Sequence, residues 1–330
     1  MPFVLLFLLT FILTVVLTVT ATRIFLPFLR KHHVGQKILE IGPAWHRTKE
    51  GTPTMGGLPF ILASVVSLVL AGGILAQSLP ALFWRPLLFT FLYALANAAV
   101  GTVDDLTKFR KRQNEGLTPA QKLVLQILFA LVYLLLLRRY GYADGTLYIP
   151  YFNTTLDLGG AYYVLAILLA VGFVNFVNLS DGVDGLCATT SFVFSSFFVA
   201  AATHLLETPA MLLASAMMGA SLGFLFFNRH PAKIFMGDTG SLFLGGMAVG
   251  CAFLIGNPLL LFVAGGIYVI EGASVVLQVA WYKATGHRLF RMAPFHHHLE
   301  KGGWSESKIV FLFALLSLFF ALLSIPGLGG

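Results

Sequence analysis

Charged side chains are scarce in this sequence. Only 11% of the 330 residues are Asp, Glu, Lys or Arg, whereas 58% are hydrophobic. Soluble domains carry about 25% charged residues, so the composition excludes an ordinary water-soluble protein. The apolar side chains form repeated runs of about 20 residues, the length that a helix needs to cross a bilayer. The sequence therefore predicts an all-α polytopic membrane protein.

Cysteine is almost absent. Cys187 and Cys251 both lie within apolar runs, and neither has the spacing of a metal ligand. We expect two small core side chains that indicate nothing about redox compartment. The N-terminal apolar stretch also lacks the positive segment and the cleavage site of a signal peptide. We interpret it as the first membrane span.

The apolar runs and the residues that interrupt them predict about ten spans. We place them at residues 3–28, 57–76, 86–103, 120–137, 161–178, 184–203, 210–227, 240–255, 258–282 and 307–325. No room remains for a soluble domain, so residues 1–330 are expected to form one integral membrane domain. Residues 146–158 alternate imperfectly and contain Pro150 and Asn153, which predicts a short β-hairpin on the outer side.

The 21 basic residues outnumber the 14 acidic ones. Only Arg85, Arg138 and Arg139 fall on the side reached after even-numbered spans, so the positive-inside rule makes the opposite side cytoplasmic. With an even number of spans, both termini lie outside. The positive charge is mostly an effect of topology, although it also attracts anionic substrates and membrane lipids. We expect no nucleic-acid partner.

Acidic residues gather at the predicted cytoplasmic helix ends. Asp104 and Asp105 lie in GTVDDLTK, Asp181 and Asp184 in NFVNLSDGVDGL, and Asp238 in FMGDTGS. Clustered carboxylates resist desolvation unless a cation compensates them. Oxygen ligands without cysteine favour a hard ion such as Mg²⁺. A single Asp at a helix end is as typical of an N-cap as of a ligand site. Capping does not explain the adjacent Asp104 and Asp105, because a cap needs only one carboxylate and two neighbouring carboxylates repel each other.

Basic residues accompany these acids on the same side. Lys49 and Thr54 belong to the glycine-rich loop KEGTPTMGG. Such a loop can bind a phosphate, and it is equally typical of a solvated loop that ends where the second span begins. Lys108 follows Asp104 by four residues and can partly neutralise the carboxylates. Lys122 can lie near a lipid phosphate.

Amides and one aromatic ring add candidate substrate contacts. Asn175 and Asn178 are three residues apart, so both side chains can face the DGVDG turn, and buried amides need partners. Asn228 can donate further hydrogen bonds, and Phe235 can offer a stacking face for a base. These residues are equally typical of a membrane interface.

Three consecutive histidines, His296, His297 and His298, stand in MAPFHHHLE before the last span. Such a tract suits a transition metal such as zinc. It equally suits contact with a pyrophosphate and stabilisation of charge on a leaving group. Glu271, in the middle of the ninth span, is an intramembrane carboxylate for which the sequence gives no partner.

Together these motifs resemble the phospho-N-acetylmuramoyl-pentapeptide transferases, within the polyprenyl-phosphate N-acetylhexosamine-1-phosphate transferase superfamily. KEGTPTMGGL, VDDLTK, NFVNLSDGVDGL, FMGDTGSL and MAPFHHHLE occur in the family's order across essentially the whole chain. The resemblance implies transfer of phospho-MurNAc-pentapeptide from UDP-MurNAc-pentapeptide to undecaprenyl phosphate, giving lipid I and UMP. It also implies Mg²⁺, a homodimer, and an active site on the cytoplasmic face of the bacterial inner membrane.

The resemblance further implies roles for individual residues. Asp104 would deprotonate or orient the lipid phosphate beside Asp105, and Asp238 would be the principal metal ligand. His296 and His297 would contact the pyrophosphate. Contacts on the nucleotide side would come from Lys49, Asn178, Asp181, Asp184, Asn228 and Phe235.

Two other functions stay open on the sequence. A close member of the superfamily would use UDP-GlcNAc and make a polyprenyl-linked GlcNAc-1-phosphate product. A cation-coupled transporter would use the acidic residues to line a permeation path. Transporters place ionisable groups near the bilayer midplane, often in repeated halves, whereas the acids of this chain gather at one end.

Overall fold

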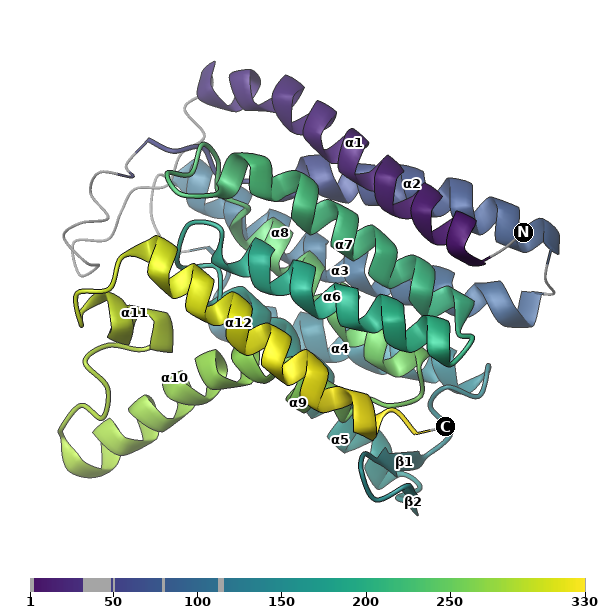
Figure 1. The fold of residues 1–330 in the computed structure, drawn as a ribbon. Helices are drawn as coiled ribbons and strands as arrows, with labels where there is room; N and C mark the ends of the chain where they lie inside the picture. Colours follow the sequence, from purple (N-terminus) through teal and green to yellow (C-terminus); the bar gives the residue numbers. More distant parts are fainter. Residues whose placement is uncertain (1–2, 32–48, 50, 79–80, 112–115, 330) are drawn as a thin grey trace.

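The computed structural model describes residues 3–31, 49, 51–78, 81–111 and 116–329 and shows a helical bundle with one small sheet (Figure 1). The long helices are α1 (Phe3–Lys31), α2 (Gly57–Ser78), α3 (Ala81–Lys111), α4 (Pro119–Arg138), α5 (Ala161–Leu179), α6 (Leu186–His204), α7 (Thr208–Asn228), α8 (Gly237–Leu254), α10 (Gly266–Thr285) and α12 (Glu306–Ser324). The shorter elements are α9 (Leu260–Ala264), α11 (Phe295–Glu300) and the 3₁₀ turn η2 (Ile325–Gly327). Within the described residues, 9 helices are long and apolar enough to cross a membrane. The all-α polytopic prediction is confirmed.

The structure divides the expected span at residues 258–282 into two helices. The helix breaks at Gly265, so that α9 precedes the break and α10 follows it. Neither piece is among the 9 spanning helices, and α10 carries the polar residues Glu271, Gln278 and Lys283. Figure 1 shows α10 leaning away from the rest of the bundle. The pair still returns the chain along the bundle, so α1 starts and η2 ends at the same end.

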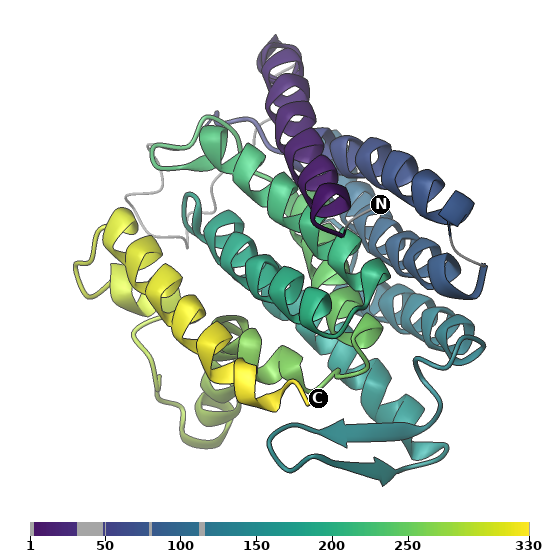
Figure 2. The same ribbon diagram turned by 45° about the vertical axis from the view of Figure 1, so that its right-hand side comes forward.

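The predicted hairpin is confirmed. Strands β1 (Thr146–Ile149) and β2 (Thr154–Asp157) pair antiparallel, with Ile149 opposite Thr154. Asn153, in the turn, has a φ of 46°, a left-handed conformation that asparagine tolerates better than most residues. The hairpin lies at the end of the bundle where the chain finishes (Figure 2). We call this end the hairpin end.

Helix α8 lies at the centre of the bundle, and every one of its residues except Asp238 is buried. Its glycines allow close approach of neighbouring backbones: a Cβ on Gly246 would lie 2.7 Å from Cα of Ala94 in α3, and one on Gly245 would lie 2.8 Å from Cα of Val174 in α5. Small residues commonly permit such packing between membrane helices. This packing holds the first turn of α8 against the last turns of α3 and α5. Elsewhere in the core, both cysteines are buried and free, as expected.

Asp104 and Asp105 lie inside α3, whereas the sequence places them at or just beyond the end of the third span. The expected span ends at residue 103, but α3 continues to Lys111. No glycine or proline interrupts VDDLTKFRK, and Lys108 forms an ion pair of 2.7 Å with Asp104 one turn earlier. The helix therefore continues past the apolar run and carries both carboxylates on a regular scaffold.

Candidate active site

Three predicted carboxylates meet at the end of the bundle opposite the hairpin. One oxygen from each of Asp104, Asp105 and Asp238 lies within 4.8 Å of the others. Asp104 and Asp105 are buried, whereas the Asp238 side chain is 19% exposed. Asp238 is therefore the member of this carboxylate cluster that a ligand can reach directly. We call this end of the molecule the carboxylate end.

Asp105 binds the first turn of α8. Its Oδ2 accepts hydrogen bonds from the backbone nitrogen and the hydroxyl of Thr239, at 2.9 and 2.7 Å. Its Oδ1 accepts a bond of 3.3 Å from the backbone nitrogen of Asp238. The first N–H groups of a helix lack partners within that helix. Asp105 therefore caps a helix other than its own, and in doing so it fixes the position of Asp238.

Two lysines lie among the carboxylates. Lys108 Nζ is 2.7 Å from Asp104 and 3.3 Å from Asp238, and Lys122 Nζ is 2.9 and 2.6 Å from the same two side chains. The neutralising role predicted for Lys108 agrees with this geometry, while the ion pairs of Lys122 come from packing that the sequence does not show. A capping box at Thr118 begins α4 and holds Lys122 in place.

The two predicted amides point to different partners. Asn178 donates to Asp238 Oδ1 at 3.2 Å and to the Ser241 hydroxyl at 2.7 Å. Asn175 instead donates to Gln126 Oε1 at 2.8 Å, which turns it toward α4. The expectation that both amides face the DGVDG turn is therefore not met for Asn175, because a buried amide of α4 offers it a partner.

A cavity of about 270 Å³ opens beside Asp238. The predicted residues that line it are Lys49, Thr54, Asn178, Asp181, Asp184, Asn228, Phe235, Asp238 and His297. They come from the loop before α2, the end of α5, the α5–α6 turn, the end of α7, the α7–α8 connection, the first turn of α8 and α11. Part of the predicted phosphate loop, including Glu50, lies outside the described residues. The structure brings distant motifs to one polar hollow.

Asp181 projects from the turn between α5 and α6 and lines this cavity. Burial raises the pKa of its carboxyl group well above the usual aspartate range, and the negative charges of Asp238, Asp105 and Asp184 raise it further. An incoming cation or hydrogen-bond donor would relieve this electrostatic conflict.

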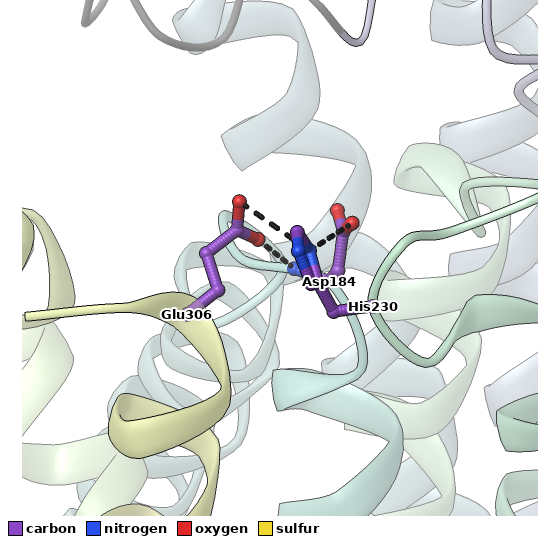
Figure 3. Close-up of side chains that lie close together, drawn as sticks. All are labelled: Asp184, His230 and Glu306. Atoms are coloured by element: carbon purple, nitrogen blue, oxygen red, sulfur yellow. Dashed lines mark hydrogen bonds and ion pairs between the residues drawn. The ribbon is translucent and has the colours of Figure 1, made fainter.

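Asp184 belongs to a second polar cluster, with His230 and Glu306, that the close-up in Figure 3 shows converging from three elements. Lys49 Nζ lies 2.6 Å from Asp184 and 2.7 Å from Glu306. His230 Nδ1 is 3.1 Å from Asp184 Oδ2. His230 and Glu306 were missed in the sequence, although Glu306 is one more acid at the start of a span on this side. This cluster fixes the α5–α6 turn to the start of α12.

Asn228 is buried and holds two segments of the cavity wall together. Its Oδ1 accepts from the backbone nitrogen of Gly185 at 3.1 Å, and its Nδ2 donates to the backbone oxygen of Ile234 at 3.0 Å. These bonds connect the α5–α6 turn with the segment that carries Phe235.

The histidine tract supplies a partner for Glu271. His296 is buried, and Glu271 binds its Nδ1 at 2.9 Å and its backbone nitrogen at 3.2 Å. The other ring nitrogen of His296 is buried without a hydrogen bond to any described residue. It lies against the α5–α6 turn, where a Cβ on Gly182 would be 2.2 Å from it. Glu271 thus sets the orientation of an imidazole that supports the cavity.

The remaining two histidines have different surroundings. His297 lines the cavity, and its Nδ1 lies 2.5 Å from Glu300 Oε2. His298 stacks on Phe295, with ring centres 5.5 Å apart, and its Nδ1 accepts a bond from the backbone of Arg291. His298 is not among the residues that line the cavity. The three imidazoles form no shared metal cluster within the described part of the chain.

The fold and the site are those of a multi-pass membrane protein that has carboxylates, lysines and a polar cavity at one end of its bundle. Residues 87–256, which include the three clustered carboxylates, match glycosyl transferase family 4. Residues 49–61, which include Lys49 and Thr54, match phospho-N-acetylmuramoyl-pentapeptide-transferase signature 1.

Similar curated proteins place the chain more narrowly. The phospho-N-acetylmuramoyl-pentapeptide-transferase of Shouchella clausii is 44% identical over 304 residues, covering 92% of this chain and 91% of the relative. Those of Oceanobacillus iheyensis and Bacillus subtilis are each 42% identical, with the same coverage. The chain therefore belongs to the phospho-N-acetylmuramoyl-pentapeptide transferase family.

Proposed function

We propose that this chain transfers phospho-MurNAc-pentapeptide from UDP-MurNAc-pentapeptide to undecaprenyl phosphate, giving lipid I and UMP. An oxygen of the lipid phosphate attacks the sugar-linked phosphorus, and the bond from that phosphorus to the UMP oxygen breaks. The observation that carries the proposal is one cavity where carboxylates, a lysine, amides and an aromatic ring meet beside the carboxylate cluster, at one end of a membrane bundle. The names of the relatives favour the muramoyl substrate over UDP-GlcNAc.

On the nucleotide side, we propose that Phe235 stacks on the uracil and that the paired Lys49 and Asp184 bind its polar edge or the ribose. All three line the cavity, and Asn228 holds the wall from which Phe235 projects. His297 and Thr54 line the same cavity and are proposed to contact the pyrophosphate. The Thr54 hydroxyl is buried without a hydrogen bond to any described residue, which leaves it available to a ligand.

On the lipid side, we propose that Lys108 and Lys122 bind the phosphate of the acceptor. Their side chains are 22% and 23% exposed, whereas the Asp104 side chain behind them is fully buried. Asp104 then orients the two ammonium groups and accepts a proton if the phosphate carries one. We favour direct attack by the lipid phosphate over an aspartyl intermediate, because the Asp104 carboxylate is fully buried and held in ion pairs with both lysines, which lowers its nucleophilicity.

The carboxylate cluster fits Mg²⁺, the ion that we propose as cofactor. Three carboxylate oxygens within 4.8 Å of one another form an all-oxygen donor set, and partly exposed Asp238 leaves room for water and phosphate. When bound, the ion would neutralise charge on the pyrophosphate and on departing UMP. Asn178 and the backbone of α8, which Asp105 caps, hold Asp238 for this contact.

We further propose that the carboxylate end faces the cytoplasm of a bacterial inner membrane and that the protein forms a homodimer. The substrates support this orientation, since a soluble nucleotide must meet a lipid phosphate at the headgroup boundary. Accessibility labelling of introduced cysteines tests the orientation, and the mass of the purified protein tests the dimer.

The decisive experiment measures Mg²⁺-dependent UMP release from the two purified substrates. Asp104→Asn and Asp238→Asn should each lower turnover by about 100-fold or more, since each removes a charge that positions a reacting group. Asp157→Asn, an exposed hairpin residue, is the matched control and should keep normal turnover. Near-normal turnover by both site variants in folded protein would refute the site assignment.

Parallel reactions separate the alternative functions. Turnover with UDP-GlcNAc alone would make the chain a GlcNAc-1-phosphate transferase, whose site would be the same. Substrate uptake into sealed vesicles without UMP production would instead support a transporter.

A further inference from the structure

A second cavity, of about 430 Å³, lies at the hairpin end of the bundle. It is separated from the carboxylate cluster by the length of α4, about 30 Å. Four tyrosines line it, Tyr140, Tyr142, Tyr148 and Tyr162. Its volume falls in the range of about 300–1,000 Å³ that is usual for small-molecule sites. Nothing in the proposed transfer reaction uses this hollow.

Two carboxylates line the same cavity without a basic partner. Half-buried Glu207 accepts a hydrogen bond of 3.1 Å from the Tyr142 hydroxyl, and exposed Asp144 accepts bonds from Thr146. Neither acid forms an ion pair with any residue that the structure describes, and the described lining contains no lysine, arginine or histidine. Burial raises the pKa of Glu207, as expected for a carboxylate that lacks a cation. Tyrosines are common at a membrane interface, but that preference does not account for the two acids.

Positive charge lies beside the cavity rather than in it. Arg85, exposed near the start of α3, donates from Nη1 to the hydroxyl of Tyr140 at 3.4 Å. Arg138, at the end of α4, lies 5.7 Å from the ring centre of Tyr163. Tyr140 is therefore shared between the cavity wall and a guanidinium. The cavity offers acids and aromatic faces inside, and at its edge lies Arg85, which forms no ion pair with any carboxylate that the structure describes.

This arrangement complements a zwitterion. We propose that the cavity binds the ethanolamine phosphate headgroup of an aminophospholipid, with the ammonium against Glu207 and Asp144 and the phosphate toward Arg85. An ammonium group donates hydrogen bonds to carboxylates and lies favourably on aromatic faces. The cavity residues lie in the hairpin, in the segments that follow α4, α6 and α8, or at the start of α5, so the hollow opens where spanning helices end and lipid headgroups lie.

The same geometry predicts selectivity among lipids. A choline headgroup carries no N–H donor for the two carboxylates, and a glycerol headgroup carries no positive charge. Phosphatidylethanolamine should therefore bind more tightly than phosphatidylcholine or phosphatidylglycerol of the same acyl chains.

Lipid retention by the purified full-length protein tests the proposal. The protein is equilibrated in detergent with equal amounts of the three lipids, and the bound lipid is counted by native mass spectrometry. We expect about tenfold more phosphatidylethanolamine than either competitor, and loss of that excess in a Glu207→Gln, Asp144→Asn variant. Arg85→Gln should also weaken retention, while Asp157→Asn, which lies on the hairpin outside the cavity, should leave it unchanged.

Two results would overturn the assignment. Equal retention of the three lipids would remove the headgroup selectivity, and an excess that survives both the double variant and Arg85→Gln would place the lipid elsewhere. A further arm adds soluble glycerophosphoethanolamine at the lipid concentration. If the soluble compound displaces the lipid completely, the ligand is a free ethanolamine phosphate and the membrane source is wrong; retention of the lipid supports it.

Discussion

Gly101→Ala tests how the helices hold the carboxylate cluster together. A Cβ at position 101 of α3 would lie 2.2 Å from the backbone oxygen of Asp238 and 2.6 Å from the backbone nitrogen of Thr239. The neighbour is backbone, so it cannot rotate away as a flexible side chain would. Because real Cβ atoms essentially never come closer than 3.0 Å to a neighbour, α3 and α8 must separate locally by about 1 Å.

This displacement of α3 from α8 should lower both the stability and the turnover of the Gly101→Ala protein. Overpacking of this kind costs about 1–3 kcal/mol of stability. The same shift stretches the bonds between Asp105 and the first turn of α8, and a misplacement of about 1 Å in a catalytic site lowers turnover by about 100-fold. We therefore expect an inserted protein with a lower melting temperature and little UMP release.

The matched control is Gly73→Ala in α2, where a Cβ meets nothing within 4 Å. Alanine in an open helical position should leave turnover unchanged and stabilise the protein by about 0.5–1 kcal/mol. Thermal unfolding and UMP release are measured on all three proteins. A Gly101→Ala protein with normal turnover and normal melting would show that the close contact between α3 and α8 does not exist.

Two further predictions concern groups that support the cavity. Glu271→Gln weakens the hydrogen bond that orients His296, so turnover should fall about 10- to 100-fold with little change in KM. Unchanged turnover in steady-state kinetics would contradict this prediction. Asp181→Asn should raise the melting temperature, and more so at pH 8 than at pH 5. The raised pKa of Asp181 means that the folded state binds its proton more tightly than the unfolded state, so the wild type loses stability as pH rises above the usual aspartate range. Equal melting temperatures of the wild type and Asp181→Asn at both pH 5 and pH 8 would contradict this prediction.

The sequence predicts the carboxylate cluster well because acids are rare in it. Only 14 of the 330 residues are acidic, so those that recur at the same end of several apolar runs are expected to share a depth in the membrane. Asp104 and Asp238 are 134 positions apart in the chain, yet shared depth and helix packing are enough to bring them together. The hairpin is predictable for a similar reason, since alternation and turn residues are local signals.

Other features depend on which face of a helix meets which neighbour, and periodicity does not reveal this in an evenly apolar span. Asn175 and Asn178 differ by less than one turn, but one meets Gln126 and the other meets Asp238. Glu306 reaches Asp184 only because α12 packs beside α6. The sequence does not predict the break at Gly265, because the residues of α9 and α10 together form one long, mostly apolar segment.

The two ends of the bundle differ in how the negative charge of their carboxylates is compensated. At the carboxylate end, three carboxylates lie among two internal lysines, so one negative charge remains and a ligand must exchange contacts with groups that are already paired. At the hairpin end, the acids of the second cavity have no internal cation among the described residues, so a ligand supplies the missing charge. Exchange suits a site that must release its product after each turnover, because the internal lysines stabilise the empty state. A site whose acids stay unpaired when empty suits a resident molecule instead, which is why a structural lipid fits the hairpin end better than a second substrate does.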